Sequence, residues 1–305
     1  MRRRLAVALI LLAAIGPWVW FLPKNPSTEA LAELVSVTSV PRQDPRVGGL
    51  SGIEVSQDGK SFTAVTDRGH IVTGVLERTA SEISGVALSD IKALRDKNGN
   101  TRDFPHTDAE GLALDARGRI YVSFEHAHRI LFYEKPGGTA QWPSYTRSWR
   151  ALTGNSGLEA VAVSKDGTLY TVPEEIQAGA SEALVYRRTP NTAWEQPFTV
   201  PVDKGFAPVG ADFGPDGRLY LLERGIYPFG FFSRVRAMDI TDEGAQNIET
   251  ILQTRLGKHG NLEGLSVWRD EAGQTRLTMV SDDNFYWFMR GQIVEYVLKA
   301  GLARR

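Results

Sequence analysis

DAEGLALDARGRIYVSFEHA, at residues 108–127, is the stretch that decides the fold of this chain. An acidic start opens a short apolar strand, a glycine-containing turn follows, and a second apolar strand ends in another acid. Four more stretches repeat this order: GLSGIEVSQDGKSFTAVTDRG (49–69), GLEAVAVSKDGTLYTVPEE (157–175), VGADFGPDGRLYLLERG (209–225) and NLEGLSVWRDEAGQTRLTMVSDDNF (261–285). A strand-based repeat of this period is typical of a propeller or a solenoid.

The spacing of the copies indicates a closed ring. When the five copies are aligned on their turn glycines, the same position upstream of the turn holds Ser51, Glu110, Glu159, Val209 and Glu263. In the last copy a short insertion separates this position from the turn. These positions lie between 49 and 59 residues apart, and the two ends of the chain together supply one more unit of that size. We therefore predict an all-β fold, a single β-propeller with five blades, or with six if one blade lacks the motif.

Each unit has room for four short strands. In the second unit the region QWPSYTRSW (141–149) would be the fourth strand. In the last unit QIVEYVL (292–298) would be the third strand, and ELVSVTSV (33–40) would be the fourth. An N-terminal strand that closes the last blade would hold both chain ends in one sheet and cover an edge strand.

The composition excludes several classes of protein and site. The chain has 305 residues, a formal net charge of −1 and no cysteine. Disulfides, thiol catalysis and cysteine-ligated zinc are therefore excluded. The near-neutral charge gives no reason to expect a nucleic-acid partner.

The N-terminus is typical of an export segment. Three arginines at 2–4 precede an apolar run over residues 5–22. Residues 1–22 are either a signal peptide or an uncleaved membrane anchor, since about 18 apolar residues can just span a bilayer. We expect a linker at 23–32, the propeller domain at 33–299 and a tail at 300–305. The protein is then exported to the periplasm and, if the segment stays, associated with the inner membrane through residues 5–22.

Acidic residues recur at both strand ends of the repeat, and a propeller brings these ends to one mouth of its channel. The inner layer consists of Ser51, Glu110, Glu159 and Glu263, with Asp212 and Glu54 as displaced members. The outer layer consists of Asp67, Glu125, Glu174, Glu223 and one of Asp282 and Asp283. Acids at strand ends can simply make turns, but their repetition favours a shared site.

Converging carboxylates stay ionised only if a cation neutralises them or they share protons. Oxygen ligands suit a hard cation, and a wide, irregular mouth favours Ca²⁺. The candidate ligands are Ser51, Glu110, Glu159, Asp212, Glu263, Asp67 and Asp282.

Other residues of the repeat are candidates for catalysis and substrate binding. Glu125 or Glu174 would be the general base, Glu223 is a further outer carboxylate, and Arg68 and Arg224 would hold an oxyanion. The two arginines could equally brace the ring through salt bridges. Two apolar loops, 225–233 and 283–289, would form a substrate wall, a membrane-facing patch or a cover over the blade edges. Their aromatic candidates are Tyr227, Phe229, Phe231, Phe285 and Trp287.

Across residues 47–298 these five ordered motifs resemble the "esterase-like activity of phytase" family of bacterial exported proteins. The resemblance implies hydrolysis of phosphate or other esters, with phytate as the nominal substrate. The acids of the ring are also similar in arrangement to those of the five-bladed, calcium-dependent apyrases. Val209 departs from the acidic pattern, so the ring is expected to be asymmetric at the fourth blade.

Two functions remain open from the sequence. One is an exported, metal-dependent hydrolase of a small-molecule phosphate ester or related ester. The other is a non-catalytic binding or scaffold propeller with a structural central Ca²⁺. Both need the same ring of acids.

Overall fold

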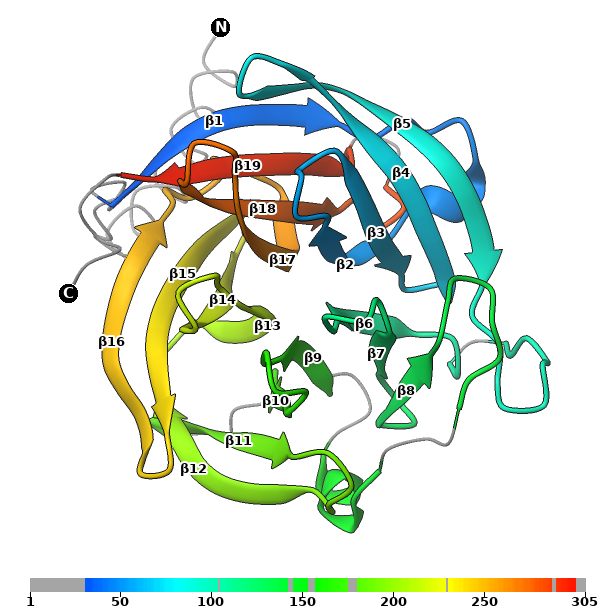
Figure 1. Cartoon of the computed structure of the whole chain (residues 1–305), viewed down its shortest axis with the longest axis vertical. Helices are drawn as coiled ribbons and strands as arrows, with labels where there is room; N and C mark the ends of the chain where they lie inside the picture. The colour runs from blue at the N-terminus through cyan, green and yellow to red at the C-terminus, as the bar shows by residue number, and fades with distance from the viewer. Residues whose placement is uncertain are drawn as a thin grey trace, which may run out of the picture.

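The computed structural model describes residues 31–299, apart from 104, 142–144, 153–156, 175–179, 229 and 287–288. In this part of the chain five antiparallel sheets stand around one axis and form a five-bladed β-propeller (Figure 1). The expected export segment, most of the linker and the tail lie outside the described residues. Within the described ranges, no helix has the length and apolarity needed to cross a membrane.

The first four blades take their strands in chain order, from the axis outward. Blade 1 consists of β2 (Leu50–Val55), β3 (Ser61–Thr66), β4 (His70–Thr79) and β5 (Glu82–Ala93). Blade 2 has β6 (Ala109–Leu114), β7 (Ile120–Phe124) and β8 (Arg129–Tyr133). Blade 3 has β9 (Leu158–Val163), β10 (Leu169–Pro173), β11 (Glu182–Arg188) and β12 (Glu195–Pro201). Blade 4 has β13 (Ala207–Phe213), β14 (Leu219–Tyr227), β15 (Gly230–Thr241) and β16 (Gly244–Gln253).

Blade 5 contains strands from both ends of the chain. β17 (Asn261–Arg269), β18 (Thr275–Asp282) and β19 (Gln292–Leu298) follow one another outward, and β1 (Ala32–Ser39) pairs antiparallel with β19. The register runs from Ala32 opposite Leu298 to Ser39 opposite Gln292. In Figure 1 the first and last described strands therefore lie side by side at the rim.

The prediction of a fourth strand of blade 2 at residues 141–149 is wrong. Among the described residues this sheet has three strands, and Arg147–Ala151 form a 3-10 helix, η2. Trp149 of η2 is fully buried and packs against Tyr186 and Trp194 of blade 3. The chain crosses to the next blade here because burying this indole against blade 3 outweighs extending an edge strand.

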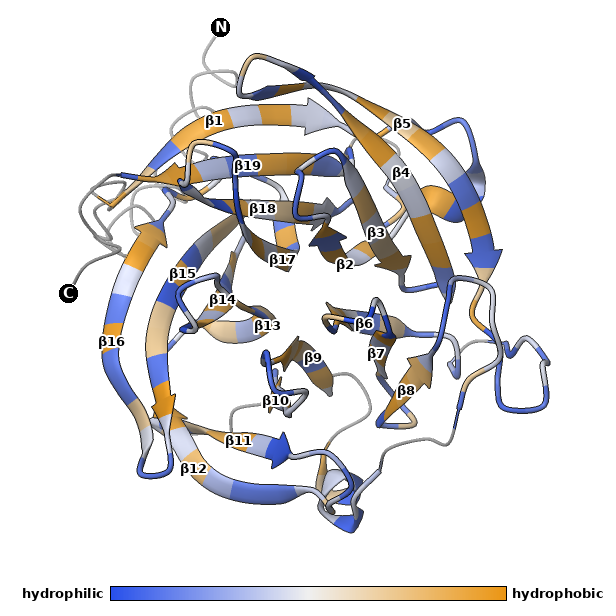
Figure 2. Cartoon of the chain, viewed as in Figure 1, coloured by the Kyte–Doolittle hydropathy of each residue, from blue (hydrophilic) through white to orange (hydrophobic). Residues whose placement is uncertain are grey.

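Apolar clusters fill the spaces between neighbouring blades. Each of the five core clusters draws its buried residues from two adjacent blades. Figure 2 shows hydrophobic residues on the strands of every blade and hydrophilic residues in most of the turns. Packing between sheets closes the ring, and the innermost strands then stand next to one another around the axis.

A β-bulge interrupts every innermost strand at the same aligned place. The pairing with the second strand shifts register at Ser51, at Glu110 and Gly111, at Glu159, at Val209 and at Glu263. A bulge leaves an extra residue unpaired and re-aims its side chain, and bulges are common beside active sites. The acidic positions found in the sequence are therefore set by the backbone itself.

Glycines after the bulges let the innermost strands approach closely. A Cβ atom on Gly111 would lie 2.2 Å from the carbonyl oxygen of Glu159, and one on Gly210 would lie 2.4 Å from that of Glu263. Only glycine fits such contacts. Between these strands the axis narrows to a cavity of about 10 Å³, so the site opens at the mouth of the ring.

Candidate functional site

Carboxylates from four blades gather at one mouth of the ring. Innermost strands begin there and second strands end there, because the two strands of each pair are antiparallel. We call this group the acidic mouth. Its members are Asp67, Asp108, Glu110, Glu125, Glu159, Glu174, Glu263 and Asp282.

Arg224 is the buried cation of the acidic mouth. Its guanidinium lies 2.5 Å from Glu174 and 3.9 Å from Glu159, and it also contacts Glu263 directly. Asn261 links the same groups, since it accepts a hydrogen bond from Arg224 at 3.0 Å and donates one to Glu263 at 2.7 Å. With three carboxylates around it, Arg224 braces blades 3, 4 and 5, the alternative role that the sequence left open.

Glu223 does not reach the acidic mouth, contrary to the expectation from the sequence. Successive side chains of a strand point to opposite faces, so a shift of one residue reverses the side. Arg224 takes the outer position in β14, and Glu223 is fully buried on the other side. Both of its oxygens accept hydrogen bonds from Arg234 and Arg236 at 2.7–3.1 Å. Glu223 is thus a structural carboxylate.

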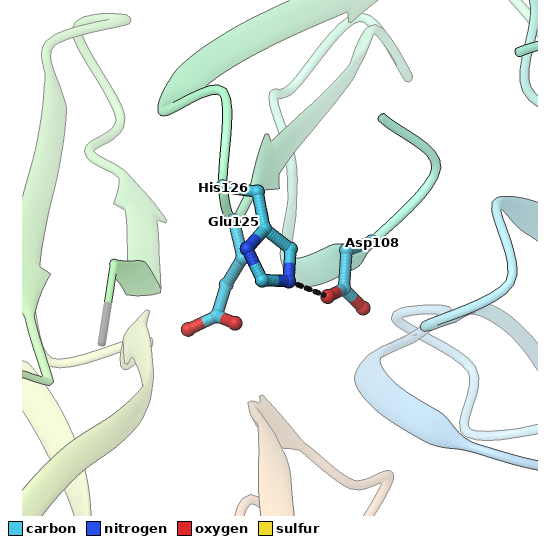
Figure 3. Close-up of side chains that lie close together, drawn as sticks. All are labelled: Asp108, Glu125 and His126. Atoms are coloured by element: carbon cyan, nitrogen blue, oxygen red, sulfur yellow. Dashed lines mark ion pairs between the residues drawn. The ribbon is translucent and has the colours of Figure 1, made fainter. Parts of the chain in front are cut away.

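Two sets of ligand atoms in the acidic mouth are close enough to share a cation. Asp108, Glu125 and His126 form one set, and Glu125, Glu159 and Glu174 form the other. Within each set, one atom of each residue lies within 4.8 Å of the others. Glu125 belongs to both sets. Figure 3 shows the His126 ring between Glu125 and Asp108, with Nε2 3.1 Å from Asp108 Oδ2.

The turn that carries Glu125 and His126 is strained. His126 has φ +55°, in the left-handed region. The backbone N–H of Ala127 donates to the carbonyl of Glu125 at 2.5 Å, which closes a γ-turn around the histidine. Such backbone costs about 1–3 kcal/mol and is often found at functional sites.

Burial and mutual repulsion raise the pKa of these carboxyl groups. Burial, together with the charge of Asp282, raises the pKa of Asp67 to about 8. Burial also raises the pKa of Glu263 to about 8, although Arg224 opposes the shift. The pKa of Asp282 rises to about 6 for the same reason, and that of Glu159 lies well above its usual value.

The donor set of the acidic mouth fits a hard divalent cation. Its ligands are carboxylate oxygens and one imidazole, and Ca²⁺ accepts six to eight oxygen ligands in a flexible geometry. Asp67 Oδ1 is buried and has no hydrogen-bond partner. Buried polar atoms normally have a partner, so this oxygen indicates a bound group. A cation there would also offset the repulsion that raises the pKa values.

Of the seven predicted ligands only Glu159 belongs to one of these two sets. Two others, Ser51 and Asp212, are not members of the acidic mouth. Ser51 donates its hydroxyl to the carbonyl oxygen of Ala109 at 2.5 Å, which links blades 1 and 2. Asp212 accepts a hydrogen bond from the backbone of Val267 at 2.6 Å. Asp212 lies three residues beyond the bulge of its strand. Burial is the main cause that raises the pKa of Glu54 well above its usual value, and the charge of Asp212 adds to the shift. Asp212 and Glu54 therefore form a second, deeper carboxyl pair.

The loop after β18 separates the two neighbouring aspartates. Asp282 faces the acidic mouth, as its interaction with Asp67 shows. Asp283 instead binds Arg42 at 2.6 Å and the backbone N–H of Gly49 at 3.1 Å. The guanidinium of exposed Arg68 lies over the ring of Phe285, 3.4 Å from its centroid. Arg68 is therefore a cation at the rim of the mouth.

The remaining aromatic candidates lie on the β14–β15 hairpin or outside the described residues. The hairpin continues three residues past Arg224, to Tyr227. Tyr227 and Phe231 are partly buried on it, and the Tyr227 ring packs on Phe232, with centroids 5.4 Å apart. Phe229 and Trp287 fall outside the described part of the chain.

Sequence reasoning did not single out Asp108 and Asn261. Both stand two residues before a bulge acid, where the other copies have Gly49, Gly157 and Ala207. The available signal was a polar residue at a position where the other copies have glycine or alanine. From the sequence, His126 and His128 could be ligands, but two histidines in this spacing at a strand end are more often incidental.

Comparison with known proteins identifies one family. The family described as phytase-like, esterase-like activity of phytase, matches residues 45–285. No curated protein matches the chain significantly. A luciferin-regenerating enzyme is similar in structure, with TM-score 0.45 and 12% identity over 88% of this chain and 96% of that chain. So is virginiamycin B lyase from Staphylococcus aureus, with TM-score 0.45 and 13% identity over 88% of this chain and 100% of that chain.

Proposed function

The chain belongs to the phytase-like family, which is described as "esterase-like activity of phytase", and from this premise we propose that it is a cation-dependent hydrolase of phosphate esters or related esters. The observation that carries the proposal is the acidic mouth. It gathers carboxylates from four blades, and the buried guanidinium of Arg224 contacts those of blades 3 and 5. Such a surplus of buried negative charge is unfavourable unless a cation binds.

We assign the cation to the second of the two sets that share Glu125. Glu125, Glu159 and Glu174 would hold it, and Asp108, Glu110, Glu263, Asp67 and Asp282 would surround it with further charge. We propose Ca²⁺, because the ligands are mainly carboxylates and the mouth is irregular. When bound, such an ion polarises the ester or phosphoryl oxygen and lowers the pKa of a bound water.

Residues of blade 2 would supply the proton transfers. Burial, with weaker contributions from Asp108 and Glu174, raises the pKa of Glu125. This shift brings the pKa of Glu125 closer to neutral pH. With one carboxylate oxygen on the cation, the other would act as the general base towards the bound water. Glu174 is held by Arg224 and is less suited to the role. Asp108 lies 3.1 Å from Nε2 of His126 and would orient this imidazole as the general acid, with Nδ1 giving the proton to the leaving oxygen.

A cavity beside His126 would take the organic part of the substrate. It has a volume of about 450 Å³, and Tyr145, Trp149 and Leu152 are among its lining residues. Its size falls in the range of small-molecule sites. The substrate would then combine an anionic head with an organic body, and exposed Arg68 at the rim would bind the head. Export to the periplasm through residues 1–22 belongs to the same proposal.

A screen of phosphate and carboxylate esters, with Ca²⁺ or with chelator, tests this function. We expect hydrolysis that needs the cation, is abolished in Glu159→Gln and survives in Glu271→Gln, a variant in the exposed turn between β17 and β18. Activity that persists in Glu159→Gln would reject the site. A melting temperature that rises with Ca²⁺ in a chain without activity would instead support the scaffold function.

A further inference from the structure

A second cavity, separate from the acidic mouth, lies between blades 1 and 2. Its volume is about 360 Å³. Its lining residues come from the loop after β5 on one side and from β8 with its following loop on the other. Arg95 and Thr139 form an isolated parallel β-bridge between the two loops. The apolar lining consists of Leu94, Phe124, Leu131, Tyr133 and Ala140. This cavity takes no part in the hydrolysis proposed above.

The charge of the cavity is opposite to that of the acidic mouth. Its charged lining residues are Arg95, Lys97, Arg102 and Arg129, and Asp96 is the one carboxylate among the described lining residues. Asp96 is already paired with Arg102 at 2.6 Å. A cationic lining over an apolar floor suits a ligand that has an anionic head and an apolar body.

Arg129 lies in the wall of the cavity, and only some of its N–H donors have an acceptor among the described residues. Its guanidinium lies over the Phe124 ring at 4.1 Å and donates to the carbonyl oxygens of Ala127 and His106, at 2.8 and 2.6 Å. Among the described residues no carboxylate forms an ion pair with it. A guanidinium has five N–H donors. Arg129 is therefore held in place by two of them while others remain for an anion.

The hydroxyl of Tyr133 is a second, independent sign of a ligand. Tyr133 is 2% exposed and lines the cavity, and its hydroxyl has no hydrogen-bond partner. A buried hydroxyl without a partner is unfavourable. A ligand oxygen in the cavity would give it one.

We propose that this cavity binds a small organic anion, a carboxylate or phosphate monoester with an apolar body, through Arg129 and the hydroxyl of Tyr133. The anion needs no metal ion here, in contrast to any anion that binds at the acidic mouth. Arg129 also holds the Ala127 carbonyl in the turn of Glu125 and His126, so the occupant lies against the back of the proposed active site.

Calorimetry on the purified chain tests the proposal with octanoate and octyl phosphate as probes. We expect saturable binding that persists in chelator. Octanamide and inorganic phosphate, which lack the charge or the apolar body, should bind at least about 10-fold more weakly. Arg129→Met should weaken octanoate binding about 10- to 100-fold, and Tyr133→Phe about 3- to 10-fold.

Arg129 lines both this cavity and the one beside His126, whereas Tyr133 lines only the first and Arg150 only the second, so variants of the latter two separate the cavities. Arg150→Met changes the cavity beside His126 and should leave octanoate binding unchanged. Tyr133→Phe keeps the volume of the side chain, so it tests the site even if Arg129→Met fails to fold. The proposal is overturned by octanamide binding as tightly as octanoate, by loss of binding in chelator, by no probe binding, or by Tyr133→Phe binding as the wild type does.

Discussion

Cation binding at the acidic mouth should release protons, because the carboxyl groups there hold them in the absence of a cation. The pKa of Asp67 and that of Glu263 are raised to about 8, and the pKa of Asp282 is raised to about 6. At pH 6.5 the first two are therefore almost fully protonated and the third is mostly ionised. A cation held by Glu125, Glu159 and Glu174 favours the ionised form of every carboxyl group around it, so binding of Ca²⁺ at this pH should release at least about two protons, those of Asp67 and Glu263. Glu159, whose pKa also lies well above its usual value, would add to this number.

The affinity for Ca²⁺ should rise with pH for the same reason. With at least about two protons released, the binding constant should increase by roughly 100-fold or more between pH 6 and pH 7 and level off above the pKa values of the groups that release them. Calorimetry in buffers with different ionisation enthalpies measures the protons released. Glu263→Gln should release about one proton fewer, while Glu271→Gln should match the wild type.

Two results would refute this reasoning. One is Ca²⁺ binding without proton release at pH 6.5, which would mean that the cation binds carboxylates that are already ionised. The other is an affinity that does not change between pH 6 and pH 7. Either result would leave the fold intact and would remove the surplus of buried charge as the basis for the site.

The remaining predictions concern stability. In chelator, the free energy of unfolding should fall as pH rises from about 4 to about 8, because the folded state holds protons that the unfolded chain has lost; a urea series at several pH values measures it, and stability that rises over this window would contradict the raised pKa values. Glu223→Gln should cost about 3–5 kcal/mol by leaving Arg234 and Arg236 with less buried negative charge, against less than about 0.5 kcal/mol for Glu271→Gln in the same urea assay. Gly111→Ala should lower the melting temperature by several degrees through the clash at the axis, and a melting temperature equal to that of the wild type would show that the strands can move apart.

The fold was predictable because the repeat is a property of local sequence. Alternating apolar strands, turn glycines and even spacing together indicated a five-bladed ring, and the structure has five blades. The expected strand at 141–149 failed because the burial of Trp149 against blade 3 is a tertiary effect. No local sequence pattern in the second unit predicts the burial of Trp149.

The sequence predicted the ring of acidic positions, but it did not predict where each side chain of the site points. Alignment found the bulge acids Glu110, Glu159 and Glu263, since one backbone irregularity recurs in every blade. In the second strand of blade 4 the nearest acid, Glu223, was taken for the ring member. Counting from the turn glycine gives Arg224, and one residue decides which face a strand side chain occupies.

Blade 4 explains how a ring of acids can fold at all. At both aligned positions it departs from the acidic pattern, with Val209 at the bulge and Arg224 at the end of the second strand. An acid at each of these places would add two more buried negative charges. Instead the one guanidinium contacts carboxylates of blades 3 and 5. The asymmetry therefore offsets part of the buried negative charge before a cation binds. A cation at Glu125, Glu159 and Glu174 would then lie between blades 2 and 3, and it would share the two blade 3 carboxylates with Arg224.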